Sequence, residues 1–112
     1  MAVAALELMM LSVTATVALL PNRYTTILGA LPTAGGNALG PTATAAAIGQ
    51  RVGVPVIGTA RVEAGAAVAV GAAIEVDALG RGITRATGVT VGRALTAATV
   101  AGQLIEVLLI AN

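Results

Sequence analysis

Glycine and proline are spaced so closely along this chain that few windows could form a stable helix. The sequence has 112 residues, among them 14 glycines and 4 prolines. One or the other interrupts nearly every stretch that would be long enough for an isolated helix. Between the interruptions lie short runs in which apolar and polar residues alternate, which is the two-residue period of a half-buried strand. The spacing predicts an all-β fold, either a small β-barrel or a β-sandwich of short antiparallel strands.

The clearest strand signal is the last one, at residues 104–110. Side chains alternate between faces along a strand, and here both faces are largely apolar. One face carries Ile105, Val107 and Leu109, and the other carries Leu104, Glu106, Leu108 and Ile110. We expect the first set to lie in the domain core. We expect Leu104, Leu108 and Ile110 to pack between copies of the chain or against a second sheet.

The apolar run at residues 2–20 resembles a membrane helix or a signal peptide only superficially. No basic residue precedes Arg23, whereas a signal peptide has a positive segment before its apolar core. Ser12, Thr14 and Thr16 alternate with apolar residues. This period favours a strand at residues 8–19 over a membrane span.

We divide the chain into an extended N-terminal arm, residues 1–11, and a single β domain, residues 12–112. An apolar segment of this kind can become ordered as it binds a partner. The arm side chains that we expect to contact a partner or a neighbouring copy are Met1, Val3, Leu6, Leu8, Met9, Met10 and Leu11. The alternative is a secreted or membrane-associated oligomeric β-protein that is anchored by residues 2–20.

Shorter strands are predicted at residues 24–28, 38–42, 51–60, 68–70, 73–76, 83–86 and 89–95. Pro55 cannot donate a ladder hydrogen bond, so it predicts an edge or bulged position in its strand. Residues 77–80 have Asp first and Gly fourth, as a type I turn prefers. We therefore expect the strands on either side of this turn to form a hairpin.

Two segments of the chain resemble each other. Residues 39–54 and 91–107 each contain a glycine, an Ala/Thr-rich stretch, a Gly-Gln pair and an alternating apolar run. Duplication of a strand–corner–strand unit would explain the similarity. Chance in a chain so rich in Ala and Gly is the competing explanation.

The residue types that most enzyme sites need are missing. The chain has no His and no Cys, which excludes the commonest general base, the usual nucleophile dyads and most zinc sites. Ser12 is the only serine and has no visible base, and Glu75 and Asp77 have no acid–base partner in the sequence. We expect no catalytic residue, no metal and no cofactor.

Charge is sparse, at 10% of residues with a formal net charge of +1. A chain with so few charges tends to hide surface in an oligomer or a larger lattice. The six arginines lie apart and lack stacking aromatic residues, which argues against nucleic acid as a partner. A buried carboxylate is costly unless it is paired, so Glu106 is expected to pair with Arg51 or Arg93, or else to lie in water at the rim of a sheet.

Several segments resemble, in their order, the cement or head-decoration proteins of tailed-phage capsids, formerly a family of unknown function. They are LSVTATVAL at residues 11–19, NALG at 37–40, VEAGAAVAVG at 62–71, IEVDALGRGIT at 74–84 and VGRALTAATVAGQLIEVLLI at 91–110. The closing segment matches best, and the first few residues match least. The resemblance rests on the order of these segments along the chain.

The resemblance implies a structural protein without catalytic residues on the outer surface of a bacteriophage head. Such a protein binds the major capsid protein, bridges neighbouring capsid subunits and stabilises the expanded, DNA-filled shell. The family is often trimeric and sometimes dimeric, which implies self-association, with a homotrimer as the first expectation. Neither nucleic acid nor a membrane is an expected partner.

Overall fold

The computed structural model describes residues 3–112 and places eight strands in them. The strands are β1 (Glu7–Thr14), β2 (Tyr24–Thr25), β3 (Gly40–Pro41), β4 (Arg51–Glu63), β5 (Ala73–Val76), β6 (Gly82–Thr84), β7 (Gly92–Ala94) and β8 (Leu104–Leu109). One sheet has the order β1-β4-β8-β7-β5-β6, and β2 pairs with β3 in a second sheet. Each of these pairs is antiparallel. No helix occurs in the described range, so the all-β prediction is confirmed.

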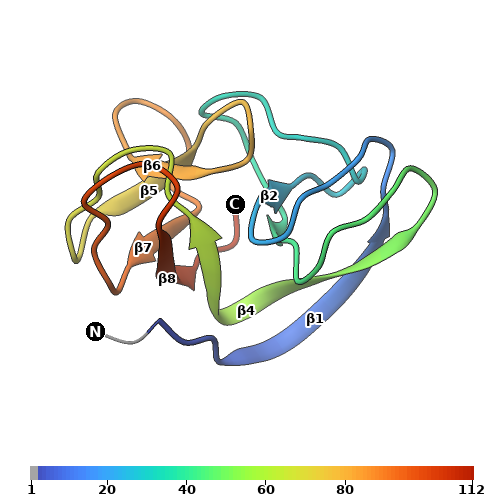
Figure 1. The fold of residues 1–112 in the computed structure, drawn as a ribbon, viewed down its shortest axis with the longest axis horizontal. Coiled ribbons are helices and arrows are strands. Elements are labelled where there is room, and N and C mark those ends of the chain that lie inside the picture. The colour runs from blue at the N-terminus through green and yellow to red at the C-terminus, as the bar shows by residue number, and fades with distance from the viewer. Residues whose placement is uncertain (1–2) are drawn as a thin grey trace.

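Strand β4 joins the two halves of the molecule (Figure 1). Its first part pairs with β1 and its last part pairs with β8, with β5 to β8 gathered on one side and β2 and β3 on the other. Gly58 stands where β4 changes its ladder partner, with a φ of +104°. A Cβ atom at this position would lie 2.1 Å from the Leu6 carbonyl oxygen. Glycine is required here, because only a residue without a Cβ atom adopts this φ readily and allows the two backbones to approach so closely.

Each half of the molecule has an apolar core of its own. The smaller core includes Val13, Leu19, Val52 and Val54, and the larger includes Val62, Ile74, Val76, Ile105 and Val107. Tyr24 of β2 is fully buried in the larger core, where its hydroxyl lies 3.5 Å from the Val91 carbonyl oxygen. Burial raises the pKa of this phenol well above its ordinary value. The only aromatic residue therefore links the β2 segment to the core of the other half.

Several sequence predictions are confirmed at the level of single residues. The strand predicted at residues 73–76 is β5, and it forms a hairpin with β6 through the turn in which the Gly80 N–H donates to the Asp77 carbonyl. Pro55 lies opposite Met10, beside a register shift in the β1–β4 ladder, as expected of a bulged position. In β8, Ile105 and Val107 are fully buried and Leu109 is partly buried.

Other predicted strands are shorter than expected, because the chain turns within them. The strand predicted at residues 8–19 begins one residue earlier and ends at Thr14, and the Thr16 N–H then donates to the Gly29 carbonyl. Residues 24–28 contribute only Tyr24 and Thr25, because the Thr26 N–H donates to the Ala30 carbonyl in a tight turn. Residues 68–70 contribute one bridge, Val68 to Ala98.

The chain consists of two structural repeats, residues 7–55 and residues 56–108, which meet within β4. In the first repeat β1 pairs with β4 and β2 with β3, and in the second β4 pairs with β8 and β5 with β7. The registers are equivalent: Thr14–Arg51 matches Glu63–Leu104, Val13–Val52 matches Val62–Ile105, Ser12–Gly53 matches Arg61–Glu106, and Thr25–Gly40 matches Ile74–Gly92. Shared composition alone does not produce a shared register, so duplication is the explanation that the fold supports.

Equivalent irregularities support the same conclusion. The Leu19–Ala46 bridge of the first repeat corresponds to the Val68–Ala98 bridge of the second. Asn22 and Gly71 occupy matching places, both have positive φ, and their N–H groups donate to the carbonyls of Thr42 and Ala94. Strand β6 belongs to the second repeat alone. The turn before it, residues 77–81, has a counterpart in the first repeat at residues 26–30, with the same two backbone hydrogen bonds and a glycine of positive φ.

Candidate functional site

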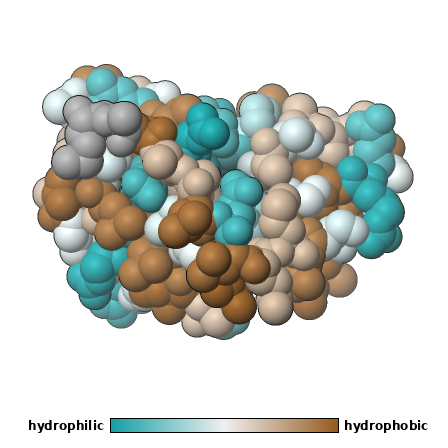
Figure 2. All heavy atoms as spheres, turned by 90° about the horizontal axis from the view of Figure 1, so that it is seen from below, coloured by the Kyte–Doolittle hydropathy of each residue, from teal (hydrophilic) through white to brown (hydrophobic). Residues whose placement is uncertain are grey.

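Strand β1 lies at one edge of the six-stranded sheet, and most of its side chains are exposed. Leu8 is 71% exposed and Met10 is 47% exposed, and Met9 and Leu11 are similar to Met10. Figure 2 views the molecule from the side on which β1 lies and shows apolar side chains spread over this face between polar ones. A long apolar edge strand is a surface that proteins usually protect, because it offers both unpaired backbone groups and apolar area.

The sheet begins earlier than the predicted division of the chain. Residues 7–11, which we assigned to the arm, form part of β1 and pair with β4. Leu6 extends this contact: its N–H donates to the Thr59 hydroxyl and its carbonyl accepts from the Thr59 N–H. Of the predicted arm contacts, Val3 is half-buried and Leu6 is exposed. Met1 lies outside the described residues.

The outer face of β8 carries the side chains that we assigned to packing. Leu104, Leu108 and Ile110 are each more than a third exposed, so no second sheet of the same chain covers them fully. Thr59, Arg61 and Glu63 of β4 lie directly opposite β8 in the ladder and share this face. The surface is therefore a mixture of aliphatic and charged side chains.

The structure does not bring Glu106 to either arginine that we proposed as its partner. The Glu106 carboxylate accepts a hydrogen bond of 2.9 Å from the Thr59 hydroxyl. Arg51 instead donates to Ser12 and Thr14 of β1, and Arg93 donates to the Gly71 carbonyl. Arg51 lies on the first half of β4, which does not pair with β8, and Arg93 lies opposite Leu108. The proposed ion pair is thus corrected to a hydroxyl–carboxylate contact at a half-buried position.

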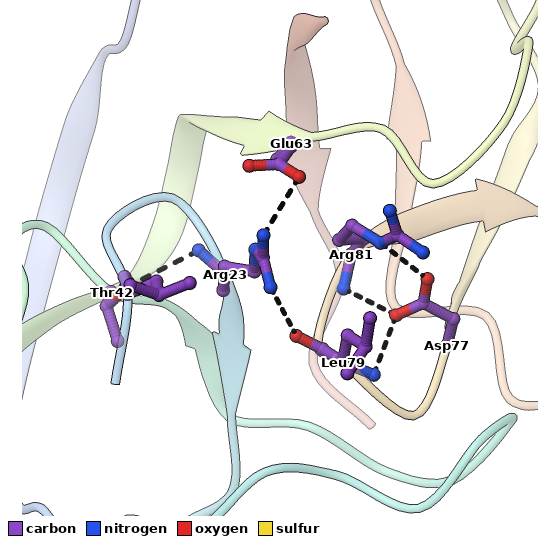
Figure 3. A network of polar contacts seen from close by, with 7 residues as sticks. Arg23, Thr42, Glu63, Asp77, Leu79 and Arg81 are labelled. Carbon is purple, nitrogen blue, oxygen red and sulfur yellow. Dashed lines mark hydrogen bonds and ion pairs between the residues drawn. The ribbon is translucent and has the colours of Figure 1, made fainter. Parts of the chain in front are cut away.

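A polar cluster that we did not predict holds the halves of the molecule together (Figure 3). The Arg23 guanidinium lies 3.0 Å from the Glu63 carboxylate and donates to the Leu79 carbonyl. Next to it, Asp77 accepts from the N–H groups of Leu79 and Arg81 and forms an ion pair of 2.9 Å with the Arg81 side chain. All these charged groups bind one another or backbone atoms, so the cluster is a structural clasp between β2, β4 and the β5–β6 turn.

Glu75 has a structural role of the same kind. Its carboxylate accepts from the N–H groups of Ala86 and Gly88 and lies against Gly35 of the first repeat. These backbone donors, helped by the charge of Arg85, lower the pKa of Glu75 below its ordinary value. Glu75 and Asp77 are therefore not a catalytic pair, because each carboxylate organises a different turn.

Two small hollows lie on the surface of the described residues. One, of about 260 Å³, is lined by Thr26, Ile27, Asn37, Ala38, Leu39 and Asn112, and no titratable side chain borders it. The other, of about 220 Å³, has both Glu7 and Arg61 in its wall. Over residues 3–112 no three acidic, His or Cys side chains come together as metal ligands would. Nor is any helix there long and apolar enough to cross a membrane.

Comparisons with known proteins agree with the fold. Residues 8–109 match the family model of the phage cement proteins. Among solved structures, the N-terminal base of the head fiber protein gp8.5 from bacteriophage phi29 is similar, with a TM-score of 0.73 and 17% sequence identity. The match covers 91% of this chain and 95% of that one. A search of curated proteins found no match.

At 17% identity the head fiber base supports the fold, and the family match supports the role. The matched range runs from β1 to the last residue of β8 and so includes both repeats. It also includes the exposed strand β1 and the outer face of β8. The chain therefore belongs to the phage cement protein family and is a structural component of a bacteriophage head, located on the capsid surface.

Proposed function

We propose that this cement protein bridges neighbouring major capsid proteins and thereby stabilises the expanded, DNA-filled shell. The observation that carries the proposal is the exposure of β1, an apolar strand at the edge of the sheet. Such a strand gains from a partner in two ways, through burial of apolar area and through backbone hydrogen bonds at its free edge. A ligand that binds the expanded lattice better than the unexpanded one stabilises the expanded state by mass action.

Residues 3–6 precede β1 and extend the proposed contact surface. Leu6 is exposed while its backbone is held against Thr59, so its side chain is presented in a fixed position. A preordered side chain loses less entropy on binding than a mobile one. Met1 and Val3 remain part of this proposal.

We also propose that the chain self-associates through the outer face of β8. Leu104, Leu108 and Ile110 would form the apolar part of that interface, and Arg61 would form polar contacts beside it. A homotrimer is the expected state and a homodimer the alternative. Size-exclusion chromatography with light scattering tests this directly: Leu108→Asp should convert the oligomer to monomers, and an unchanged mass would place the interface elsewhere.

Binding to expanded heads that lack the protein tests the bridging proposal. Leu8→Ser and Met10→Ser each remove apolar area from β1, and each should weaken head occupancy by about fivefold or more, since roughly 1 kcal/mol is lost per substitution. Leu79→Ser is a matched control, because Leu79 is 48% exposed but lies in the β5–β6 turn. Full occupancy by both β1 variants would overturn the role of β1. Deletion of residues 1–11 is a poor test, because it removes most of β1.

The rival proposal, a membrane-associated protein anchored by residues 2–20, predicts a different distribution. The described part of this segment is strand and turn, with Val13, Ala15 and Leu19 buried in the smaller core. Fractionation of infected cells separates the two proposals. A capsid protein sediments with virions, whereas an anchored protein sediments with membranes.

A further inference from the structure

Each repeat contains a corner of the same kind, and this corner lies just before the strand that closes the repeat. In the first corner the Ala47 N–H donates to the side-chain oxygen of Gln50 at 2.8 Å, and in the second the Thr99 N–H donates to that of Gln103 at 2.7 Å. The glycine before each glutamine has positive φ. We call these two segments, residues 46–50 and 98–103, the Gly-Gln corners.

The backbone of each Gly-Gln corner is bonded to the opening strand of its own repeat. The Gly49 N–H donates to the Ala15 carbonyl, and the Gly102 N–H donates to the Ala64 carbonyl. The Ala15 and Ala64 N–H groups return the bond to the carbonyls of Gln50 and Gln103. Each corner is therefore rigidly attached to its own half of the molecule.

Each Gly-Gln corner presents one branched aliphatic side chain to solvent. Ile48 is 70% exposed in the first corner, and Val100 is 58% exposed in the second, which is one residue longer. The neighbouring side chains are small, since the corners otherwise consist mainly of Ala, Gly and Thr. A single large apolar group on a fixed turn suits insertion into a shallow apolar pocket, because little entropy is lost when it docks.

The two corners lie toward opposite ends of the molecule (Figure 1). The segment between β3 and β4 forms one end of the long dimension, and the segment between β7 and β8 lies on the opposite side. The longest extent of the chain is 35 Å. One copy therefore presents two similar projections, well apart and in fixed relation.

We propose that Ile48 and Val100 are twin docking points, each of which inserts into an equivalent apolar pocket on one of two neighbouring copies of the same capsid protein. A lattice of identical subunits offers the same pocket repeatedly, and a chain with a duplicated projection matches two of those pockets at once. The turn that exposes Ile27 and Leu28 has a counterpart at residues 77–81, with the same two backbone hydrogen bonds and with Leu79 exposed. This second pair of turns lies outside the Gly-Gln corners and supplies the control residue Leu28. The inference rests on the proposed function as a bridge between capsid subunits.

Two-point attachment makes a specific prediction about affinity. With both corners docked, the second contact forms at a high effective concentration, so loss of either corner should remove most of the gain from bivalency. Ile48→Ser and Val100→Ser should each lower the affinity for expanded heads by about tenfold or more. The double variant should bind more weakly than either single variant.

The experiment compares the occupancy of expanded heads by the wild-type chain, both single variants, the double variant and the control Leu28→Ser, whose side chain is 74% exposed. Unchanged melting temperatures establish that each variant is folded. Wild-type affinity in either single corner variant would overturn the twin-docking proposal. So would a change in oligomeric state at unchanged head occupancy, because the corners would then contact another copy of this chain. Failure of the wild-type chain itself to bind heads would instead refute the proposed function on which the inference rests.

Discussion

Gly40 and Gly92 stand at equivalent places in the two repeats, each pressed against a backbone carbonyl of the strand that closes its repeat. A Cβ atom on Gly40 would lie 2.2 Å from the Pro55 carbonyl oxygen, and one on Gly92 would lie 2.8 Å from that of Leu108. Pro55 and Leu108 are themselves equivalent, since they oppose Met10 and Thr59 in matching ladders. The requirement for glycine at this crossing is thus a property of the repeated unit.

Alanine at either glycine should destabilise the fold. Gly92→Ala places a methyl group 2.3 Å from a Val107 methyl carbon as well, in a buried strand that cannot move away freely. Overpacking of this kind costs about 1–3 kcal/mol. Urea denaturation should show a lower midpoint for Gly40→Ala and for Gly92→Ala. A variant as stable as the wild type would mean that the two strands can move apart to accommodate the methyl group at little cost.

Asn22 and Gly71 form a second equivalent pair and give a test of backbone strain without steric contact. Their φ values are +61° and +86°, and a Cβ on Gly71 would meet nothing within 4 Å. Gly71→Ala should therefore cost about 1 kcal/mol from the left-handed backbone alone, whereas Gly71→Asn should cost less. Thermal melting of the two variants measures the difference. Equal losses of stability in the two variants would show that the positive φ is not the reason for glycine at position 71.

The same equivalences show what the sequence could and could not predict. The strand at 73–76 and the alternation in β8 were visible because β-branched and apolar residues repeat at the period of a strand. The Gly-Gln pairs and the glycines that begin β3 and β7 were visible as a repeated pattern, but composition left chance as an alternative. Only the matching registers of β1–β4 and β4–β8 decide between the two explanations.

Contacts between distant segments were the part that the sequence could not supply. We predicted an ion pair of Glu106 with Arg51 or Arg93 because both arginines lie in neighbouring strand units. The Glu106 carboxylate instead accepts a hydrogen bond from Thr59, a neutral residue in the second half of β4. The ion pair between Arg23 and Glu63 joins residues that are far apart in the chain, and no local sequence pattern predicts it. The exposure of β1 likewise depends on the order of strands in the sheet, which follows from tertiary packing.

The Arg23–Glu63 pair should contribute measurably to stability because both side chains are mostly buried in the clasp. Removal of one partner leaves the other charge poorly solvated, so Glu63→Ala should cost about 2 kcal/mol. The cost should be smaller when Arg23 is already Met, because the unpaired charge is then absent. A double-mutant cycle by urea denaturation gives the coupling energy. No coupling between the two substitutions would mean that the bond to the Leu79 carbonyl alone holds Arg23.

Glu75 should make the fold sensitive to acid. Its folded-state pKa lies below the ordinary value of 4.5, because the Ala86 and Gly88 N–H groups bind its charged form. The unfolded chain therefore takes up this proton at a higher pH than the folded chain does. The stabilisation from Glu75 is fully present above the unfolded-state pKa, and it is lost as the pH falls through the folded-state pKa.

The Glu75→Gln variant isolates this contribution from that of the other carboxylates, which titrate in both proteins. The amide keeps the shape of the side chain and one acceptor oxygen but has no charge to lose. At pH 7 the variant should have the lower urea midpoint, and the gap to the wild type should close as the pH falls below the ordinary pKa of 4.5. A gap that stays constant over this range would show that the turn at residues 85–88 depends on the shape of the side chain and not on its charge.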